Sequence, residues 1–319
     1  MIVFHDPAEV PDGFGPSVVA IGKFDGVHAG HRAVLERARV DAATGGAKVV
    51  AVTFDRNPLS ILRPEACPES VIGMHQKLRL LEETGIDATL MLRFDQELAA
   101  VPAEEFVTRI LVDALDARAV LVGRDFRFGR GGAGTPDLLD RLGATHGFRV
   151  DIVDDVREIG SERRVSSTWI RELLTAGDVV GTAKLLGRPP AVWGEVVRGL
   201  QRGRALGFPT ANLAPDLEGF VPADGVYAGW LVDEPSAGGL HPGRRYPAAI
   251  SVGTNPTFDD VDARVVEAYV LDETDLDLYG HHVEIQFVAR VRGMVAFDSV
   301  DALIARMNDD VAQVRRLLT

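Results

Sequence analysis

The chain has 319 residues, of which 46% are hydrophobic and 25% are charged, and its formal net charge is −13. This length favours two domains, and the negative charge argues against broad nucleic-acid binding, which needs a basic face. No run of about 18 apolar residues occurs, so we expect no transmembrane helix. The single cysteine, Cys67, excludes an internal disulfide and a cysteine-based zinc cluster. Since the amino terminus also lacks the pattern of a secretory signal, we expect a cytosolic protein without membrane or nucleic-acid partners.

The first half of the chain alternates short apolar runs with helical patterns. The apolar runs are rich in Val, Ile and Leu, which is typical of strands buried on both faces of a parallel sheet. Between them, apolar residues recur three and four positions apart, as in the stripe of Phe106, Val107, Ile110 and Leu111. The alternation predicts a doubly wound α/β domain. The predicted strands are residues 17–22, 48–54, 88–94, 118–123 and 148–153.

A change of pattern near residue 188 predicts a domain boundary. Two consecutive prolines, Pro189 and Pro190, cannot continue the helical patterns before them, so we expect domains at 1–187 and 188–319. The second half consists of short strands separated by Gly, Pro and Asp turns, until a helical pattern appears at 297–318. This order predicts a small antiparallel β-barrel with a C-terminal helix, whose N-cap is Asp298 or Ser299.

A glycine-rich turn joins the first predicted strand to the helix that follows it. The helix N-terminus offers unpaired N–H groups and partial positive charge, which favour an anion. We expect this helix to begin near His31. His28 and His31 lie at this junction and can donate hydrogen bonds to phosphate oxygens. A metal site is the weaker interpretation, since neither an H-E-x-x-H pattern nor cysteine partners are available. The segment therefore predicts a phosphate site.

The sequence G-x-F-D-G-x-H-x-G-H of this turn, residues 22–31, resembles the signature of the flavin-specific branch of the nucleotidyltransferases. The resemblance implies a Rossmann-like nucleotidyltransferase domain with a parallel sheet. It also implies that His28 and His31 hold the ATP phosphates and stabilise the charge that develops on the α-phosphorus during adenylyl transfer. The other residues of the motif, expected to bind nucleotide, are Gly22, Phe24, Asp25, Gly26 and Gly30.

Two further segments of the first half resemble the same family. The segment R-R-V-S-S-T-W-I-R, residues 163–171, resembles a second phosphate motif of this family. The resemblance implies that its hydroxyls, backbone amides and arginine bind the β- and γ-phosphates. Helix capping is the alternative, because Ser and Thr are also frequent N-caps. The segment V-G-R-D-F-R-F-G, residues 122–129, resembles one beside the nucleotide in FAD synthetases; a loop with two core phenylalanines is the alternative. The residues expected to bind nucleotide or flavin are Asp125, Arg164, Ser166, Ser167, Thr168 and Arg171.

One departure from the family pattern follows the second predicted strand. Family members commonly carry T-F-D-P-H-P there, whereas this chain has T-F-D-R-N-P at residues 53–58. Asn57 stands where a histidine is usual, and Arg56 replaces a proline. The difference puts one phosphate or flavin contact of the family in question.

The second half carries the segment G-R-A-L-G-F-P-T-A-N-L, residues 203–213. At strand spacing Thr210 and Asn212 point to the same face, and two neutral oxygens there can hold Mg²⁺ together with ATP phosphates; an ordinary turn is the alternative. The segment resembles the PTAN motif of riboflavin kinases, and the resemblance implies Thr210 and Asn212 as metal ligands. The flanking residues expected to bind nucleotide or flavin are Gly203, Arg204, Gly207 and Pro209.

The same resemblance continues toward the carboxyl terminus. It implies that Glu267 is the general base that takes a proton from the 5′-hydroxyl of riboflavin, because an alcohol that attacks a γ-phosphate must lose its proton. Asn255 and Thr257 are expected to line the flavin or to shape the backbone, with an ordinary turn as an equal alternative.

The resemblance covers nearly the whole chain, and the family is that of bacterial bifunctional riboflavin kinase/FAD synthetases. It implies phosphorylation of riboflavin by ATP to FMN in the barrel, then adenylylation of FMN to FAD with release of pyrophosphate in the α/β domain, both with Mg²⁺. Two rival interpretations stay open: a chain with only one active half, and a non-enzymatic flavin-binding protein. The oligomeric state is not predicted.

Overall fold

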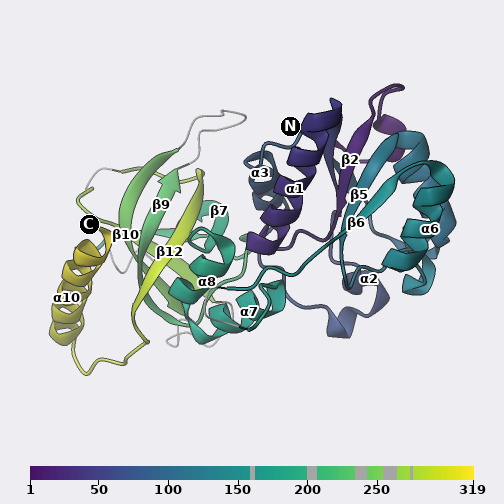
Figure 1. Ribbon diagram of the computed structural model, residues 1–319. Helices are drawn as coiled ribbons and strands as arrows, with labels where there is room; N and C mark the ends of the chain where they lie inside the picture. Colours follow the sequence, from purple (N-terminus) through teal and green to yellow (C-terminus); the bar gives the residue numbers. More distant parts are fainter. Residues whose placement is uncertain (159–161, 200–206, 234–242, 254–263, 274–275) are drawn as a thin grey trace. The chain divides into compact units, whose positions relative to one another are not determined.

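The structure is a computed structural model that describes residues 1–158, 162–199, 207–233, 243–253, 264–273 and 276–319 (Figure 1). The chain forms two compact units. The first comprises residues 1–70 and 74–166, and the second comprises residues 71–73 and 167–319. The division falls inside the second phosphate motif, between Ser166 and Ser167. Each unit is described by itself below.

A six-stranded parallel sheet forms the centre of the first unit, in the strand order β1-β4-β3-β2-β5-β6. All five predicted strands are present, and the doubly wound α/β architecture is confirmed. The pattern missed β1 at the sheet edge, because three residues are too short for a periodicity to show. The strands are β1 (Ile2–Phe4), β2 (Ser17–Ile21), β3 (Lys48–Phe54), β4 (Ala88–Leu92), β5 (Ala117–Gly123) and β6 (Arg149–Val153).

Helices cover both faces of this sheet, with α1 and α6 on opposite sides of it (Figure 1). The predicted stripe from Phe106 to Leu111 is buried in the core, which confirms the expected face. After one α-helical turn this segment continues as a π-helix, Val107–Ala114. The helices are α1 (Ala29–Gly45), α2 (Leu59–Leu62), α3 (Met74–Glu82), α4 (Gln96–Ala100), α5 (Ala103–Phe106) and α6 (Pro136–His146).

The strand order places a topological switch point between β2 and β5. From β2 the chain proceeds to β3 and β4 on one side of the sheet, and β5 and β6 lie on the other side. In open α/β sheets, ligands bind beyond the carboxyl ends of the strands at such a point. A nucleotide site is therefore expected beside the loops that follow β2 and β5, at residues 22–28 and 124–129.

A closed antiparallel barrel forms most of the second unit, in the order β10-β11-β8-β7-β12-β9, as predicted. Two helices, α7 (Ser167–Ala176) and α8 (Val179–Leu186), precede it. Interior and exterior residues alternate along the strands, so that Val266 and Ala268 are buried inside while their neighbours face outward. The strands are β7 (Ala191–Val197), β8 (Thr210–Leu213), β9 (Gly225–Asp233), β10 (Arg244–Gly253), β11 (Val265–Val270) and β12 (His282–Arg292).

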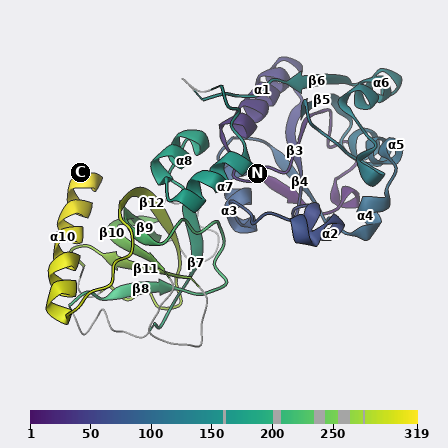
Figure 2. The same cartoon turned by 90° about the horizontal axis from the view of Figure 1, so that it is seen from below.

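The C-terminal helix α10 (Val300–Leu318) lies along the barrel beside β10 (Figure 2). Its N-cap is Ser299, one of the two predicted caps, whose hydroxyl accepts the N–H of Ala302 at 3.2 Å. The buried Val314 packs on Ala228 and Leu271 of the barrel. The predicted closing helix is therefore confirmed.

A buried ion pair fastens α10 to β12. The Arg292 guanidinium donates to both carboxylate oxygens of Asp310 at 2.7–3.1 Å, and the two side chains are 12% and 5% exposed. Replacing Asp310 by alanine leaves a guanidinium without its carboxylate, so we expect the free energy of unfolding of the second unit to fall by about 3–5 kcal/mol.

Tryptophan fluorescence during denaturation measures this change, because all three tryptophans, Trp169, Trp193 and Trp230, lie in the second unit. Asp309→Ala is the matched control: Asp309 is the neighbouring residue, is exposed, and is expected to change stability by less than about 0.5 kcal/mol. Equal losses in the two variants would contradict the role given to the ion pair.

Candidate functional sites

The loop between β2 and α1 has a strained backbone at the switch point. Phe24 and Val27 adopt positive φ angles of 48° and 38°, which is rare for bulky residues and most unusual for a β-branched one. Both side chains are fully buried, so packing holds the loop in this conformation. Strain of this kind persists where the surroundings fix it and clusters at ligand sites. Packing of the Phe24 and Val27 side chains therefore fixes the backbone conformation of this loop.

His28 is the N-cap of α1, whose first residue, Ala29, lies two residues before the predicted helix start near His31. Its Nδ1 accepts the N–H of His31 at 3.4 Å, which places the ring proton on Nε2 and makes Nε2 a donor. The His31 ring stacks on the His28 ring with centroids 3.7 Å apart. The structure thus brings the two predicted histidines together at a helix N-terminus, where an anion is favoured.

Gly30 packs closely against His28 in this turn. A Cβ at residue 30 would lie 3.2 Å from ring atoms of His28 and 3.9 Å from the carbonyl oxygen of Val165. Any side chain there would press on the His28 ring. The same contact shows that Val165, at the start of the second phosphate motif, lies against the first motif.

The loop after β5 contributes Asp125, which is paired with Arg164 of the second phosphate motif. Their side-chain atoms are 2.9 Å apart, and the two groups are 68% and 48% exposed. An exposed pair of this kind adds little to stability. Phe126 and Phe128 stack on each other beside it, and Phe128 is buried in the core. The phenylalanines are thus structural, and Asp125 and Arg164 stay available at the switch point.

The rest of the second phosphate motif lies at the start of α7. The helix begins at Ser167, and Ser166 precedes it. Arg171 and Thr168 lie one turn apart on the helix, with Nη2 of the arginine 3.5 Å from Oγ1 of the threonine. These hydroxyls and this guanidinium share a helix N-terminus, which suits phosphate.

Asn57, at the departure from the family pattern, has a structural role. Its side-chain oxygen accepts the N–H of Leu59 at 3.1 Å and its carbonyl accepts the N–H of Ser60 at 2.8 Å. The asparagine therefore starts the turn that becomes α2. Among the residues that the structure describes, no three His, Cys, Asp or Glu side chains gather as a metal site.

The second unit brings the predicted kinase residues together across two strands. Glu267 of β11 lies directly opposite Asn212 of β8 in the antiparallel register, and Tyr269 lies opposite Thr210. Opposed residues in such pairs have Cβ atoms about 4.5–5.5 Å apart on the same face. The Asn212 amide donates to the carbonyl and the hydroxyl of Thr210 at 3.2 and 3.3 Å. All three functional side chains therefore share the outer face of the barrel.

The environment of Glu267 changes its acidity. Burial raises the pKa of the Glu267 carboxyl above its ordinary value, because the charged form loses solvation. A raised pKa brings a carboxylate closer to the operating pH and makes it a better general base.

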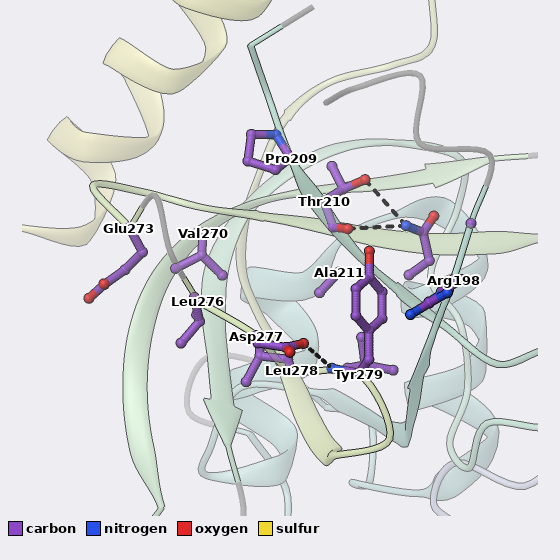
Figure 3. Close-up of a pocket in the computed structure, with 13 residues that line it drawn as sticks. Arg198, Pro209, Thr210, Ala211, Val270, Glu273, Leu276, Asp277, Leu278 and Tyr279 are labelled. Atoms are coloured by element: carbon purple, nitrogen blue, oxygen red, sulfur yellow. Dashed lines mark hydrogen bonds between the residues drawn. The ribbon is translucent and has the colours of Figure 1, made fainter. Parts of the chain in front are cut away.

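Thr210 and Asn212 line a pocket of about 410 Å³ on this unit. Arg198, Asp277 and Tyr279 line it as well, and the Tyr279 ring stands beside Thr210 and Arg198 (Figure 3). The Arg198 guanidinium lies 5.4 Å from the centre of the Tyr279 ring. The pocket combines a cation, an aromatic face and hydroxyl and amide groups, which suits a nucleotide.

The structure describes part of the glycine-rich segment that precedes β8. A Cβ at Gly199 would lie 2.6 Å from the Asn212 side chain, so only glycine fits there. Gly207 has a positive φ of 88°, and Pro209 lines the pocket. The predicted residues Gly203, Arg204, Asn255 and Thr257 lie outside the described residues.

Two family models match the chain in sequence. The FAD synthetase model matches residues 12–169, and the riboflavin kinase model matches residues 186–318. The bifunctional riboflavin kinase/FMN adenylyltransferase of Escherichia coli (strain K12) is 35% identical over 93% of this chain and 91% of its own length. The chain belongs to the bifunctional riboflavin kinase/FMN adenylyltransferase family. This confirms the predicted family, function and enzyme class.

Other relatives agree with this assignment to the riboflavin kinase/FMN adenylyltransferases. The enzyme of that name from Pseudomonas fluorescens is 37% identical over 94% of this chain and 92% of its own length. A solved structure from Streptococcus pneumoniae, described as a macrolide-efflux protein, matches with a TM-score of 0.83 and 30% identity over 98% of each chain. From that protein we take the fold alone. Within the described ranges, no helix combines the length and apolar composition needed to cross a membrane.

Sequence reasoning did not single out three residues at the two candidate sites. Arg198 and Tyr279 line the pocket beside Thr210 and Asn212, and Lys77 is buried in the first unit. Arg198 stands just before the glycine-rich segment, and Tyr279 ends a segment already similar to the kinases, so proximity to motifs was an available signal for both. For Lys77 the sequence carried no such signal, because a lysine in a helical pattern is usually exposed.

Proposed function

We propose that the two activities of this family are divided between the units, with riboflavin phosphorylated on the barrel and FMN adenylylated at the β2–β5 switch point. The observation that supports the kinase site best is the pairing of Glu267 with Asn212 beside Thr210. The observation that supports the second site best is the pair of stacked histidines at the N-terminus of α1.

On the barrel, Glu267 acts as the general base. Its carboxylate accepts the proton of the riboflavin 5′-hydroxyl as the hydroxyl oxygen attacks the γ-phosphorus of ATP, and the bond to the β-phosphate oxygen breaks to release ADP. The raised pKa of Glu267 strengthens it as a base for this step. Arg198 and Tyr279 hold the nucleotide in the pocket.

The donor set of the pocket fits Mg²⁺. The Thr210 hydroxyl and the Asn212 carboxamide lie 3.3 Å apart on one face and supply neutral oxygens. Mg²⁺ keeps several waters and is held by few protein ligands together with substrate phosphates, so two such groups suffice. When bound, the ion offsets phosphate charge. Thr210 and Asn212 are the residues that would hold it.

At the switch point, the chain stabilises charge and has no proton to remove. The attacking group is the phosphate of FMN, which is already ionised, and it displaces pyrophosphate from the α-phosphorus of ATP. Nε2–H of His28 and the imidazole of His31 donate to the α-phosphate oxygens, where negative charge grows. We assign Asp125 and Arg164 to the ribose and phosphate groups, and the hydroxyls and arginine of the 166–171 segment to the β- and γ-phosphates.

The test is incubation of the purified chain with riboflavin, ATP and Mg²⁺, with FMN and FAD followed over time. We expect FMN to appear first and FAD to follow. No turnover would leave only the flavin-binding interpretation, and FMN without FAD would favour a chain with one active half. Omitting Mg²⁺ and adding a chelator is expected to stop both steps.

We propose that the kinase domain begins near residue 188, as the sequence predicts, although α7 and α8 belong to the second compact unit. A fragment 188–319 is expected to phosphorylate riboflavin. A fragment 167–319 is expected to do so with higher stability, because the carbonyl of Leu174 in α7 accepts the N–H of Ala223 at 2.9 Å. Thermal unfolding of both fragments measures the difference, and an inactive 188–319 fragment that folds would contradict the boundary.

We further propose a cytosolic location and small-molecule partners only. The substrates are riboflavin, FMN and ATP, and the acidic net charge of −13 is unfavourable for nucleic acid. Fractionation of cells that express the chain is expected to leave it in the supernatant after membranes are removed.

A further inference from the structure

Lys77 of α3 is a buried lysine in the first unit. Its side chain is 8% exposed, and its ammonium donates to the carbonyl oxygen of Phe54, the last residue of β3, at 3.2 Å. Lysine is almost never buried unless its charge is compensated. An apolar side chain would fill this space without burying a charge. We therefore infer that the ammonium group of Lys77 has a role of its own.

Two carboxylates, one from each of two neighbouring loops, act electrostatically on the Lys77 charge. Burial lowers the pKa of Lys77, while the charges of Asp25 and Asp55 act in the opposite direction. Asp25 lies in the strained loop after β2, and Asp55 is the first residue after β3. Since β2 and β3 are adjacent parallel strands, these two loops lie side by side at the carboxyl ends of the strands.

Further hydrogen bonds tie these strand ends to each other. The Thr53 hydroxyl donates to the carbonyl of Lys23 at 3.2 Å, which joins the β3 end to the β2 loop. Oδ1 of Asp55 accepts the N–H of Phe94 at 2.9 Å, which joins the β3 end to the segment after β4. Lys77 therefore belongs to a network that fixes the backbone from which Phe24, Val27 and His28 project.

We propose that Lys77 is a positioning residue for adenylyl transfer, whose ammonium holds the end of β3 through the Phe54 carbonyl, so that the β2–α1 loop tied to this end by Thr53 presents His28 and His31 to the α-phosphate. The proposal rests on the function assigned above to the two histidines. Lys77 touches neither substrate nor the reacting atoms in this role. Its loss is therefore expected to affect the rate of the chemical step more than the binding of ATP.

The test uses the full chain with Lys77→Met, assayed in both reactions. We expect kcat for conversion of FMN to FAD to fall about 10–100-fold, because a displacement of about 1 Å in a catalytic group has effects of that order. The KM for ATP is expected to change far less, and riboflavin phosphorylation is expected to be unchanged. Lys48→Met is the matched control, since Lys48 is exposed at the opposite end of β3.

A double-mutant cycle with Thr53→Val tests the route of the effect. If Lys77 acts on the β2 loop through the end of β3, then Lys77→Met is expected to cost clearly less in the Thr53→Val background than in the wild-type chain. Losses that simply multiply would overturn the proposal. A loss of stability of the first unit with unchanged kcat would overturn it as well, because that is the result expected of a merely structural lysine.

Folding of the first unit is followed by calorimetry, since its residues include no tryptophan or tyrosine. If Lys77→Met prevents folding, Lys77→Arg and Lys77→Gln are compared instead, and equal kcat in the two would overturn the proposal because only arginine keeps the charge. A wild-type chain that makes no FAD would overturn both this proposal and the proposed function. An active wild-type chain whose Lys77→Met variant has normal kcat would overturn this proposal alone.

Discussion

Replacing Glu267 by glutamine is expected to lower the rate of riboflavin phosphorylation by about 10²–10⁴-fold, the usual contribution of a general base. Glutamine keeps the size and the hydrogen bonding of the side chain but cannot accept the proton. Conversion of supplied FMN to FAD is expected to be unchanged, because no step assigned to the switch point uses Glu267. Separate assays with riboflavin and with FMN as the starting flavin measure the two effects.

The pH dependence of the two reactions gives a second check on Glu267. The base must be deprotonated, so phosphorylation is expected to rise with pH through the pKa of Glu267. Because burial raises that pKa, the rise lies at higher pH than for an exposed glutamate. This rise of the rate with pH should disappear from the residual phosphorylation activity of Glu267→Gln. It should also be absent from the pH profile of adenylyl transfer.

The matched control for this variant is Glu195→Gln, an exposed glutamate on β7 of the same barrel. Its phosphorylation rate and pH profile are expected to equal those of the wild-type chain. If Glu267→Gln were folded by tryptophan fluorescence and still phosphorylated riboflavin at the wild-type rate, Glu267 would not be the base. Loss of both activities in a folded variant would contradict the division into two sites.

Replacing His28 and His31 together by alanine is expected to give the reverse pattern. Conversion of FMN to FAD should fall by about 10²–10³-fold or more, because a single donor to developing negative charge commonly contributes that much. Riboflavin phosphorylation should be unchanged, so FMN accumulates when the variant is given riboflavin. Chromatography of the flavins over time distinguishes this result from slow catalysis of both steps.

Two further variants make the histidine experiment specific. His5→Ala removes an exposed histidine of the same unit and is expected to leave FAD formation unchanged. His28→Asn keeps a side chain that can cap α1, so it separates the cap from the donor at Nε2. Full FAD formation by His28→Asn would show that His28 contributes only its cap.

Local motifs and periodicity were sufficient for the fold class and for placing most of the candidate site residues on their elements. The parallel strands follow from apolar runs, and the barrel follows from short alternating strands between turns. Thr210 and Asn212 could be placed on one face because alternation along a strand is a property of the backbone. The histidine motif could be placed at a helix N-terminus for a similar reason. These features depend on neighbours in sequence.

The elements that sequence reasoning missed depend on distant contacts. β1 has three residues and is a strand because β4 offers it hydrogen bonds. The start of α1 moves to Ala29 because the His28 side chain caps it, which the pattern of apolar residues does not reveal. Asn57 starts the turn into α2, although the family pattern suggested only a missing contact.

By itself, the sequence determined the candidate groups for the proposed chemistry: two histidines at a helix N-terminus, a threonine and an asparagine two residues apart, and a glutamate on a strand. Only the tertiary structure decided which of these groups lie together, because register and burial join residues that are far apart in the chain. It placed Glu267 opposite Asn212 and raised the Glu267 pKa by burial. It also paired Asp125 with Arg164 and buried Lys77 in the first unit.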